Sequence, residues 1–361
     1  MYGGAFAEGT SAIPMYDGRH LVSAHPDIIV VTFNYRVNIF GFANSPAVPE
    51  KNVGFRDQRL ALEWLRDNIA AFGGDPKRMV LGGQSAGSMS TSMYPYAYPT
   101  DPIVRGLITE SGEATNPRPD DGTRWTALAD ALGCRSSNSK EELRCMQEVD
   151  AYKLKRTLSP EELNPLSSPA DIHPTLDNVT YFGNDAYPSL GAAGKFAKIP
   201  ALRGIMNNEG RSLTPFTPEG LVNETIADWL TEIAFNCPAA GEARVWAAHR
   251  IPSWRYRYFG EFPSLAVYDW MKAYHGADIP LLFGTINSVH LRDLEPYELE
   301  AQKYFQQALV TFVKDPHDGL KNFGWPVYNP NTTSLVELFK NNSPIATFTE
   351  ASTYDTICFQ F

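Results

Sequence analysis

The sequence predicts an α/β protein with a mostly parallel central sheet. Three observations lead to this class: a strand, a helix and a second strand follow one another early in the chain, more short apolar runs come later, and the composition is globular. Hydrophobic residues make up 43% and charged residues 20% of the 361 residues, which is enough apolar material for a large core. A strand, a helix and a strand in succession form the repeating unit of a parallel sheet, so the pattern predicts helices packed on such a sheet.

The strand–helix–strand unit begins at residues 27–33. This run, DIIVVTF, is apolar and rich in β-branched residues, as buried parallel strands are. A helical pattern follows it, and the breakers GGDP at 73–76 end that helix before a second strand at 79–82. One face of the predicted helix is apolar and consists of Phe55, Leu62, Leu65, Ile69 and Phe72.

Further strands are predicted downstream, at residues 106–109, 201–206, 255–259 and 355–361. The stretch between Pro119 and Pro200 is polar and rich in loop formers, which indicates insertions and helices that cap the sheet. A helical, aromatic-rich stretch follows from about residue 220 to residue 246. We expect residues 1–361 to form one domain with large insertions rather than two independent domains.

The charge balance excludes several classes of partner. The chain has 31 Lys and Arg against 41 Asp and Glu, a net charge of −10. Nucleic acids and anionic membranes bind clustered cations, so we expect neither as a partner. No apolar run approaches the roughly 18 residues of a membrane helix, so no transmembrane segment is predicted. The oligomeric state stays open.

The cysteines and sequons point to an oxidising setting. The four cysteines include no C-x-x-C pair, and the histidines show no zinc spacing, so no metal site is expected. An even cysteine count and several N-x-[ST] sequons favour secretion. The first ten residues, MYGGAFAEGT, lack the basic and apolar regions of a signal peptide. Either the protein is cytosolic or the sequence begins partway into a longer one. The candidate glycosylation sites are Asn178, Asn223, Asn331 and Asn341.

The strongest functional motif is GQSAG at residues 83–87, directly after a predicted strand. In G-x-S-x-G, the serine occupies a tight turn from strand to helix, and the glycines leave room for its strained backbone. Ser85 would then lie at a helix N-terminus, where the helix dipole favours developing negative charge. The alternative is an ordinary Gly/Ser turn between a strand and a helix.

A nucleophilic serine needs a base, and seven histidines compete for that role: His20, His25, His173, His249, His275, His290 and His317. In this architecture the chain order is serine, acid, histidine, which leaves those well downstream. His275 precedes a glycine in a loop, whereas His249 resembles a surface residue of a helix. Position therefore favours His275, although any single histidine is more often structural or solvated.

The acid must orient the imidazole and stabilise its cation. Glu209 follows the predicted strand 201–206 and precedes a glycine, and catalytic groups collect at the carboxyl ends of strands in α/β folds. Asp278 is a rival for the role of acid, but it lies only three residues after His275. We expect it to support the site from outside the set of residues that contact the substrate. Glu209 is also compatible with a plain solvated turn.

An oxyanion site is the remaining requirement. The residues Gly3, Gly4, Ala5 and Phe6 form a glycine-rich loop whose backbone N–H groups can face one point. Two adjacent glycines also suit any turn, so this motif alone carries little weight.

Together these motifs resemble the type-B carboxylesterase family, which includes cholinesterases and fungal lipases. The similarity runs along the whole chain, through YGGAF, NYRVNIFGF, the long segment from GFRDQ to GGQSAGS, and then ESG, NEG and HGAD. It implies an α/β-hydrolase fold with Ser85 as nucleophile, Glu209 as acid and His275 as base. It also implies oxyanion donors at Gly4, Ala5 and Ala86, no cofactor, and the disulfides Cys134–Cys145 and Cys237–Cys358.

The activity implied by this resemblance is hydrolysis of carboxylic esters through an acyl-enzyme on Ser85. The substrate would be a small-molecule or lipid ester, and the sequence leaves esterase or lipase open. The alternative from another class is a non-catalytic binding or adhesion module of the same fold. Such relatives typically lack the nucleophile, which is present here.

Three departures from the family pattern matter. Ala5 replaces the third glycine of the usual oxyanion loop, which restricts its backbone. Gln84 stands where cholinesterases carry a glutamate, which weakens the case for a cationic choline substrate. The family's opening strands, signal peptide and first disulfide loop are absent, and the Glu209-to-His275 interval is short. We therefore expect an N-terminally truncated domain of a secreted parent, weakly active or inactive by itself.

Overall fold

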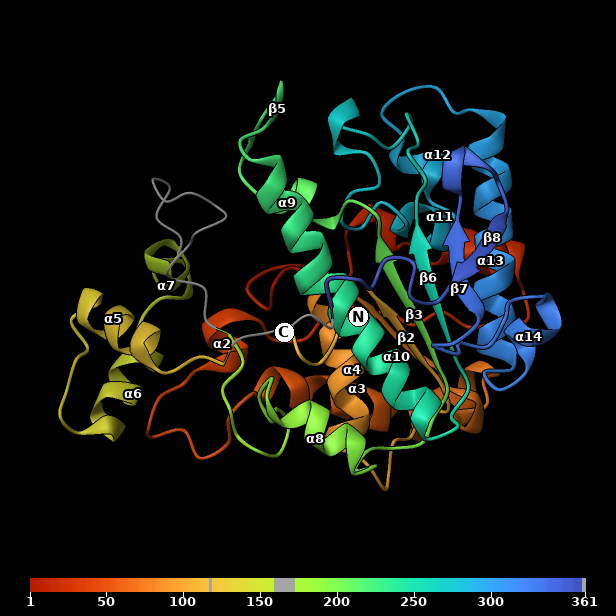
Figure 1. Ribbon diagram of the computed structural model, residues 1–361. Coiled ribbons are helices and arrows are strands. Elements are labelled where there is room, and N and C mark those ends of the chain that lie inside the picture. The colour runs from red at the N-terminus through yellow and green to blue at the C-terminus, as the bar shows by residue number, and fades with distance from the viewer. Residues whose placement is uncertain (117–118, 159–172, 359–361) are drawn as a thin grey trace.

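A six-stranded sheet occupies the centre of the described chain (Figure 1). The structure is a computed structural model that describes residues 1–116, 119–158 and 173–358. The strand order is β1-β2-β3-β6-β7-β8, with every neighbouring pair parallel except β7 and β8. A separate two-stranded hairpin, β4–β5, projects from the molecule. The predicted mostly parallel α/β class is therefore confirmed.

The elements have the following bounds. The strands are β1 (Leu81–Gln84), β2 (Leu107–Glu110), β3 (Ala201–Met206), β4 (Phe216–Thr217), β5 (Gly220–Leu221), β6 (Ser253–Tyr258), β7 (Thr333–Leu338) and β8 (Ala346–Glu350). The α-helices are α1 (Arg19–Ala24), α2 (Asn38–Phe42), α3 (Val53–Asn68), α4 (Ala86–Ala97), α5 (Thr123–Ala131), α6 (Ser139–Glu148), α7 (Ala151–Leu158), α8 (Ala186–Ala192), α9 (Glu224–Leu230), α10 (Cys237–Ala248), α11 (Ile279–Phe283), α12 (Ile286–Val289), α13 (Pro296–Lys314) and α14 (Gly319–Phe323). Shorter turns used below are the 3₁₀ helices η1 (Pro14–Tyr16), η2 (Ile69–Phe72) and η4 (Glu209–Ser212), and the π-helix η5 (Thr231–Asn236).

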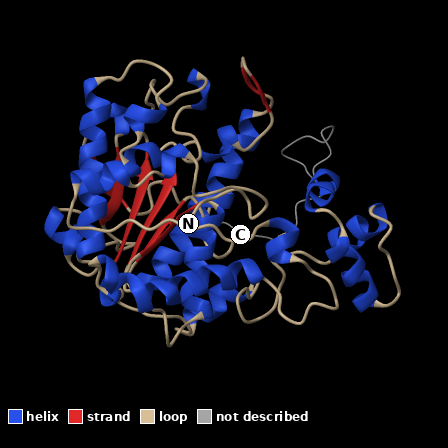
Figure 2. Ribbon diagram, turned by 180° about the vertical axis from the view of Figure 1, so that it is seen from behind, coloured by secondary structure: helices blue, strands red, loops and turns tan. Residues whose placement is uncertain are grey.

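Helices cover both faces of the sheet (Figure 2). Neighbouring residues of a strand point to opposite faces, and Leu107 and Ile108 of β2 accordingly belong to two different core clusters. The first cluster includes Trp246 of α10, and the second includes Phe305 and Phe312 of α13. Every residue of the inner strands β2, β3 and β6 is buried, and these residues include Arg203 on β3 and Arg255 and Arg257 on β6.

The predicted helix near the start of the chain is confirmed. It consists of α3 followed by η2, and it ends at Gly73, whose φ of 84° is left-handed. Phe55, Leu62 and Ile69 are buried, as its apolar face requires, whereas Phe72 is 67% exposed and does not belong to that face. The predicted strand at 79–82 is β1, which begins two residues later.

The predicted strand at residues 27–33 is wrong. These residues pair with no strand among the described residues, and Ile29 and Val31 are 46% and 44% exposed. A cavity of about 560 Å³ lies between this segment and β1, lined by Ile28 and Val30 on one side and by Leu81 on the other. A strand exists only through hydrogen bonds to a neighbour, so an apolar β-branched run with none adjacent stays extended but unpaired.

Three later strand predictions are confirmed within two residues, as β2, β3 and β6. The predicted strand at 355–361 is wrong, because residues 355–358 form turns; residues 359–361 lie outside the described part. The sheet continues instead through the hairpin β7–β8, which the sequence analysis missed.

The described part of the segment between Pro119 and Pro200 contains the expected helices, although not all of them cap the sheet. Helices α5, α6 and α7 form a group that projects to one side of the sheet (Figures 1 and 2). The disulfide Cys134–Cys145 lies in this group, with its Cα atoms 5.4 Å apart. The stretch from 220 to 246 contains α9, the π-helix η5 and most of α10. None of the helices in the described ranges is long and apolar enough to span a bilayer.

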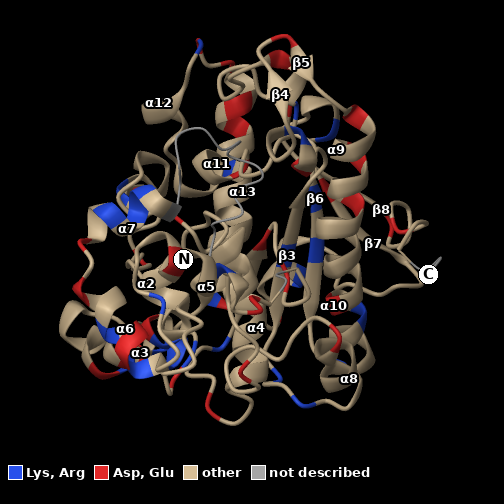
Figure 3. Cartoon of the chain, turned by 90° about the vertical axis from the view of Figure 1, so that its left-hand side faces the viewer, with Lys and Arg blue, Asp and Glu red and all other residues tan. Residues whose placement is uncertain are grey.

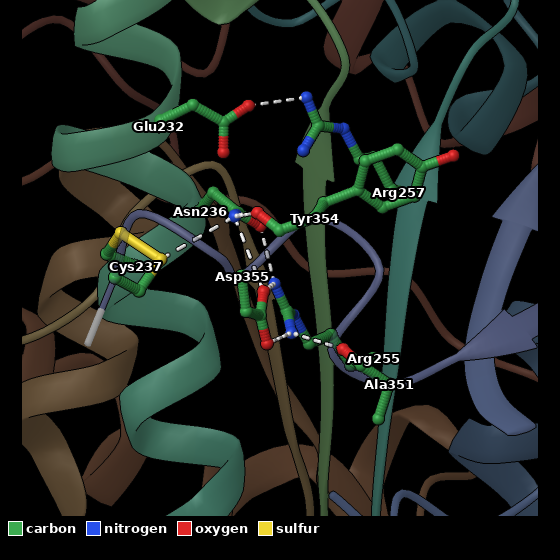
Figure 4. The surroundings of a disulfide bond; sticks show 9 residues. Glu232, Asn236, Cys237, Arg255, Arg257, Ala351, Tyr354 and Asp355 are labelled. Atoms are coloured by element: carbon green, nitrogen blue, oxygen red, sulfur yellow. Dashed lines mark hydrogen bonds and ion pairs between the residues drawn. A yellow bond between two sulfur atoms is a disulfide. The ribbon is translucent and has the colours of Figure 1, made fainter. Parts of the chain in front are cut away.

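The second disulfide, Cys237–Cys358, ties the start of α10 to the end of the described chain (Figure 4). Its Cα atoms are 5.0 Å apart, and both disulfide pairings implied by the family resemblance are therefore confirmed. Arginines lie within the sheet on β3 and β6, where Figure 3 shows basic residues. One of them, Arg255, pairs with Asp355, and both side chains are only 1% exposed.

Candidate active site

Ser85 occupies a sharp turn between β1 and α4. Its φ of 54° and ψ of −121° lie outside the ordinary regions for a residue with a side chain. Its N–H donates to the carbonyl oxygen of Glu110 over 2.8 Å, which fixes the end of β1 against β2. A Cβ at Gly83 would lie 2.2 Å from the carbonyl oxygen of Gly87, so only glycine fits there. The turn leaves Ser85 half-buried at the N-terminus of a 12-residue helix, as the motif predicts.

Glu209 lies directly after β3, at the start of η4, and its side chain is fully buried. Its Oε1 accepts a hydrogen bond from the N–H of Met206 over 2.7 Å. Its Oε2 lies 2.5 Å from Nδ1 of His275. A buried carboxylate needs donors, and Glu209 has one on each oxygen. The structure thus brings together the two residues that the sequence analysis proposed as acid and base.

His275 lies in the loop before α11, with its side chain 10% exposed. Its second ring nitrogen, Nε2, lies 3.1 Å from Nε2 of Gln84, the residue that precedes the nucleophile. No hydrogen bond joins Oγ of Ser85 to His275 anywhere in the described hydrogen-bond network. Gln84 therefore connects the imidazole of His275 to the turn that holds Ser85.

The π-helix η5 supports both members of the acid–base pair. The ring of Phe235 packs on the imidazole of His275, with 5.2 Å between ring centroids. Thr231 accepts a hydrogen bond from the N–H of Gly210 over 3.0 Å, next to the acid. π-Helical turns occur frequently at functional sites, and this one packs against the imidazole of His275 through Phe235.

The predicted oxyanion loop lies against the nucleophile. A Cβ at Gly3 would lie 2.7 Å from Cβ of Ser85, so the loop makes a close approach there. Gly4 and Ala5 both have positive φ, 115° and 54°, and within the described chain their N–H groups donate to no backbone carbonyl. Ala86 is the first residue of α4, where an N–H has no partner inside the helix. These three N–H groups remain available to a ligand.

Two further carboxyls are buried next to the acid–base pair. Asp278 is fully buried, and burial together with the negative charge of Glu209 raises its pKa to about 7. The hydroxyl of Tyr256 donates to its Oδ2 over 3.2 Å. Burial, with a smaller contribution from Asp278, also raises the pKa of Glu110 well above its usual range. Asp278 forms no hydrogen bond to His275 in the described network, so the structure places this rival acid behind the pair.

The other downstream histidines lie elsewhere. Nε2 of His249 is 2.8 Å from the carbonyl oxygen of Gly191, and His290 and His317 are exposed. Burial lowers the pKa of His173 to about 4. In the described ranges, none of these rings bonds Glu209 or the GQSAG segment.

No group of three or more His, Cys, Asp or Glu side chains among the described residues is placed to hold a metal ion. The cavity beside β1 is lined by Gln84 and Glu110 but by neither Ser85 nor His275, so it is distinct from the Glu209–His275 pair.

All four sequon asparagines are exposed: Asn178, Asn223, Asn331 and Asn341.

Three residues of the site escaped the sequence analysis as contributors. The sequence places Gln84 beside Ser85, but it does not show that the side-chain amide of Gln84 points toward His275. Tyr16, whose hydroxyl lies 3.5 Å from Oε1 of Gln84, and Phe235 carry no local signal at all. Their roles depend on contacts between distant segments.

The chain is similar to several known esterases and lipases. The chlorogenic acid esterase of Aspergillus niger is 36% identical to the chain over 376 residues, covering 99% of this chain and 71% of that protein. Secreted lipase 5 of Gibberella zeae is 32% identical over 363 residues, covering 95% of this chain and 68% of the lipase. The cholinesterase of Mus musculus is 35% identical over 229 residues, covering 61% of this chain and 37% of the mouse protein.

A sequence model described as the carboxylesterase family matches residues 1–225 and 219–357. The matched ranges contain Ser85, Glu209, His275 and the parallel sheet described above. The chain has the α/β-hydrolase fold and belongs to the carboxylesterase family.

Proposed function

We propose that the chain hydrolyses carboxylic esters through an acyl-enzyme on Ser85, with His275 as base and Glu209 as its orienting acid. The observation that carries this proposal is the 2.5 Å contact between Glu209 and His275, beside a serine in a strained strand-to-helix turn. The alternative of a binding module does not account for a complete set of nucleophile, base and acid.

The chemistry follows from the donors present. Nε2 of His275 takes the proton of Ser85 as Oγ attacks the ester carbonyl carbon, and the buried Glu209 stabilises the imidazolium. The carbonyl oxygen becomes an oxyanion that accepts from the N–H groups of Gly4, Ala5 and Ala86. The imidazolium then protonates the leaving alcohol, and water hydrolyses the acyl-enzyme by the same sequence of proton transfers.

We propose an uncharged small-molecule or lipid ester as substrate. Gln84 places a neutral amide, rather than a carboxylate, beside the nucleophile, so nothing at that position attracts a cationic alcohol group. The names of the related proteins include an esterase of a phenolic acid and a lipase. Initial rates on matched soluble and emulsified esters decide between esterase and lipase.

A serine-directed fluorophosphonate probe tests the proposal directly. We expect stoichiometric labelling of Ser85 and no labelling of the Ser85→Ala variant, which should also lose ester turnover by a factor of at least about 10⁵ because the triad acts as a unit. Circular dichroism and a thermal melt confirm that the variant folds. A well-folded chain that neither binds the probe nor turns over a short-chain nitrophenyl ester would agree with the weakly active or inactive domain expected from the sequence. The same result after a family-type N-terminal segment has been restored would leave the binding module as the better assignment.

We also propose that the protein works outside the cell as a glycoprotein. Two disulfides and four exposed sequon asparagines support this setting. The test is expression through a secretory pathway, followed by peptide mapping without reduction and by enzymatic glycan removal. Four free thiols or no glycan at any sequon would contradict it.

A further inference from the structure

Gln84 turns its side chain toward the base rather than toward solvent. The residue is 7% exposed, and its Nε2 lies 3.1 Å from Nε2 of His275. Its Oε1 lies 3.5 Å from the hydroxyl of Tyr16, which donates from η1. One side-chain amide therefore connects the strand of the nucleophile, the loop of the base and the segment that follows the oxyanion loop.

Packing holds this amide in place. A Cβ at Gly3 would lie 2.6 Å from Oε1 of Gln84, and a Cβ at Gly276 would lie 3.5 Å from its Nε2. The oxyanion loop and the loop of the base thus close on the amide from two sides. Glycine at position 3 leaves the space that the amide occupies.

The direction of the hydrogen bond fixes a protonation state. The amide nitrogen of Gln84 can only donate, so Nε2 of His275 accepts and the ring proton lies on Nδ1, facing Glu209. This is the tautomer in which Nε2 can take a proton from serine. Oγ of Ser85 itself makes no hydrogen bond to the ring in the described network, so the amide of the preceding residue occupies the acceptor nitrogen.

We propose that Gln84 is a positioning residue for the reaction proposed above: its amide holds Nε2 of His275 beside Ser85 as a hydrogen-bond acceptor until the serine hydroxyl takes its place. The inference rests on the proposed ester hydrolysis. It assigns to the residue before the nucleophile a role in setting the tautomer and orientation of the base.

The pH dependence of the reaction reports on this hydrogen bond. A donor to Nε2 stabilises the neutral imidazole but not the imidazolium, so it extends activity to lower pH. The titratable groups around Gln84 and His275 are the Met1 amino group, Tyr16, Glu110, Glu209, Tyr256 and Asp278. Two of these groups titrate near neutral pH: burial and Glu209 raise the pKa of Asp278 to about 7, and burial lowers the pKa of the Met1 amino group to about 6. The test therefore includes an Asp278→Asn background.

The experiment measures kcat/KM of a neutral short-chain ester against pH for wild type, Gln84→Leu and Gln84→Glu. Loss of the donor in Gln84→Leu is expected to move the acid limb to higher pH by up to about one unit, the size of a neutral hydrogen bond. Gln84→Glu should move it further in the same direction, because a carboxylate favours the imidazolium. The shift should persist in the Asp278→Asn background.

Gln58 supplies a matched control. It is another buried glutamine, 4% exposed, and its Nε2 donates to Oγ of Ser90 over 3.1 Å, away from His275. Gln58→Leu loses the same kind of hydrogen bond next to the same helix, α4. We expect its acid limb to coincide with that of wild type even if the variant is less stable.

A measurement without substrate keeps this inference separate from the proposed function. In protein with ¹⁵N-labelled histidine, the ring signals of His275 are assigned by their loss in His275→Asn and then titrated by NMR. The Nε2 resonance and its titration should change in Gln84→Leu and stay unchanged in Gln58→Leu, whether or not the chain turns over esters. Unchanged ring titration and an unchanged acid limb in Gln84→Leu would overturn the proposal.

Discussion

Asp278 and Asp355 are two aspartates buried to the same degree in opposite electrostatic surroundings. Asp355, 1% exposed near the Cys237–Cys358 disulfide, makes two 2.8 Å hydrogen bonds to the guanidinium of Arg255 (Figure 4). Asp278, fully buried behind the acid–base pair, has the hydroxyl of Tyr256 but no guanidinium, and its Oδ1 has no hydrogen-bond partner in the described structure. A paired carboxylate joins segments together, whereas burial without a cationic partner raises the pKa of a carboxyl, so that it holds its proton up to a higher pH.

The difference follows from what each region must do. The region around Asp355 joins β6 to the segment that ends at Cys358, and a permanent ion pair suits a permanent joint. Asp278 lies next to the imidazole of His275, which gains and loses a proton in the reaction proposed above. There a second carboxylate held ionised would compete with Glu209 for the same positive charge.

The largest expected effect comes from the carboxylate that does contact the imidazole. Glu209→Gln should lower kcat by about 10⁴, because the amide favours the wrong tautomer of His275, while the fold is retained. Steady-state kinetics on a nitrophenyl ester measure it, with Asp278→Asn as the matched control that stays within about tenfold of wild type. The reverse order, an active Glu209→Gln and an inactive Asp278→Asn, would exchange the two assignments.

The second largest effect is a loss of stability when the ion pair between Arg255 and Asp355 is broken. Asp355→Ala should lower the free energy of unfolding by about 3–5 kcal/mol, because it leaves the Arg255 charge buried without its partner. Urea unfolding measures the loss. A double variant, Arg255→Met with Asp355→Leu, should recover most of it. A single variant as stable as wild type would show that the pair is not a clamp.

The smallest effect concerns the unpaired aspartate and depends on pH. The folded-state pKa of Asp278, about 7, lies above its unfolded value, so the folded state binds more protons between about pH 4 and pH 7. The stability from this group is therefore full at low pH and is lost as pH rises through 7. Asp278→Asn should match wild type near pH 4 and be the more stable protein at pH 8, as thermal melts at both values will show. An equal difference at both pH values would contradict the assignment.

Local features of the sequence predicted the fold and the elbow well. The helix α3, its glycine stop and the strand before GQSAG follow from periodicity and breakers within a few residues. Residues 27–33 failed because a strand depends on a partner that their own composition does not reveal. The hairpin β7–β8 was missed because β8 is largely exposed and lacks an apolar run.

The residues of the candidate site also differ in how far the sequence predicts them. Ser85 is recognisable from a local motif, whereas Glu209 and His275 were predicted from chain order and family resemblance. The amide of Gln84 on His275 joins residues 191 positions apart, and the Arg255–Asp355 pair spans 100. Side-chain directions across such separations follow from the assembled sheet, and no periodicity encodes them.

The spacing of the cysteines has a consequence for biosynthesis. Four cysteines allow three pairings in a chain that refolds from denaturant. During translation, however, Cys145 leaves the ribosome only 11 residues after Cys134, whereas Cys237 waits for 121 residues before Cys358 appears. The short loop closes first, since its ends meet soonest, and it consumes both nearby thiols. Among these four cysteines, Cys358 is then the partner that remains for Cys237, so synthesis in this order favours the native pairing.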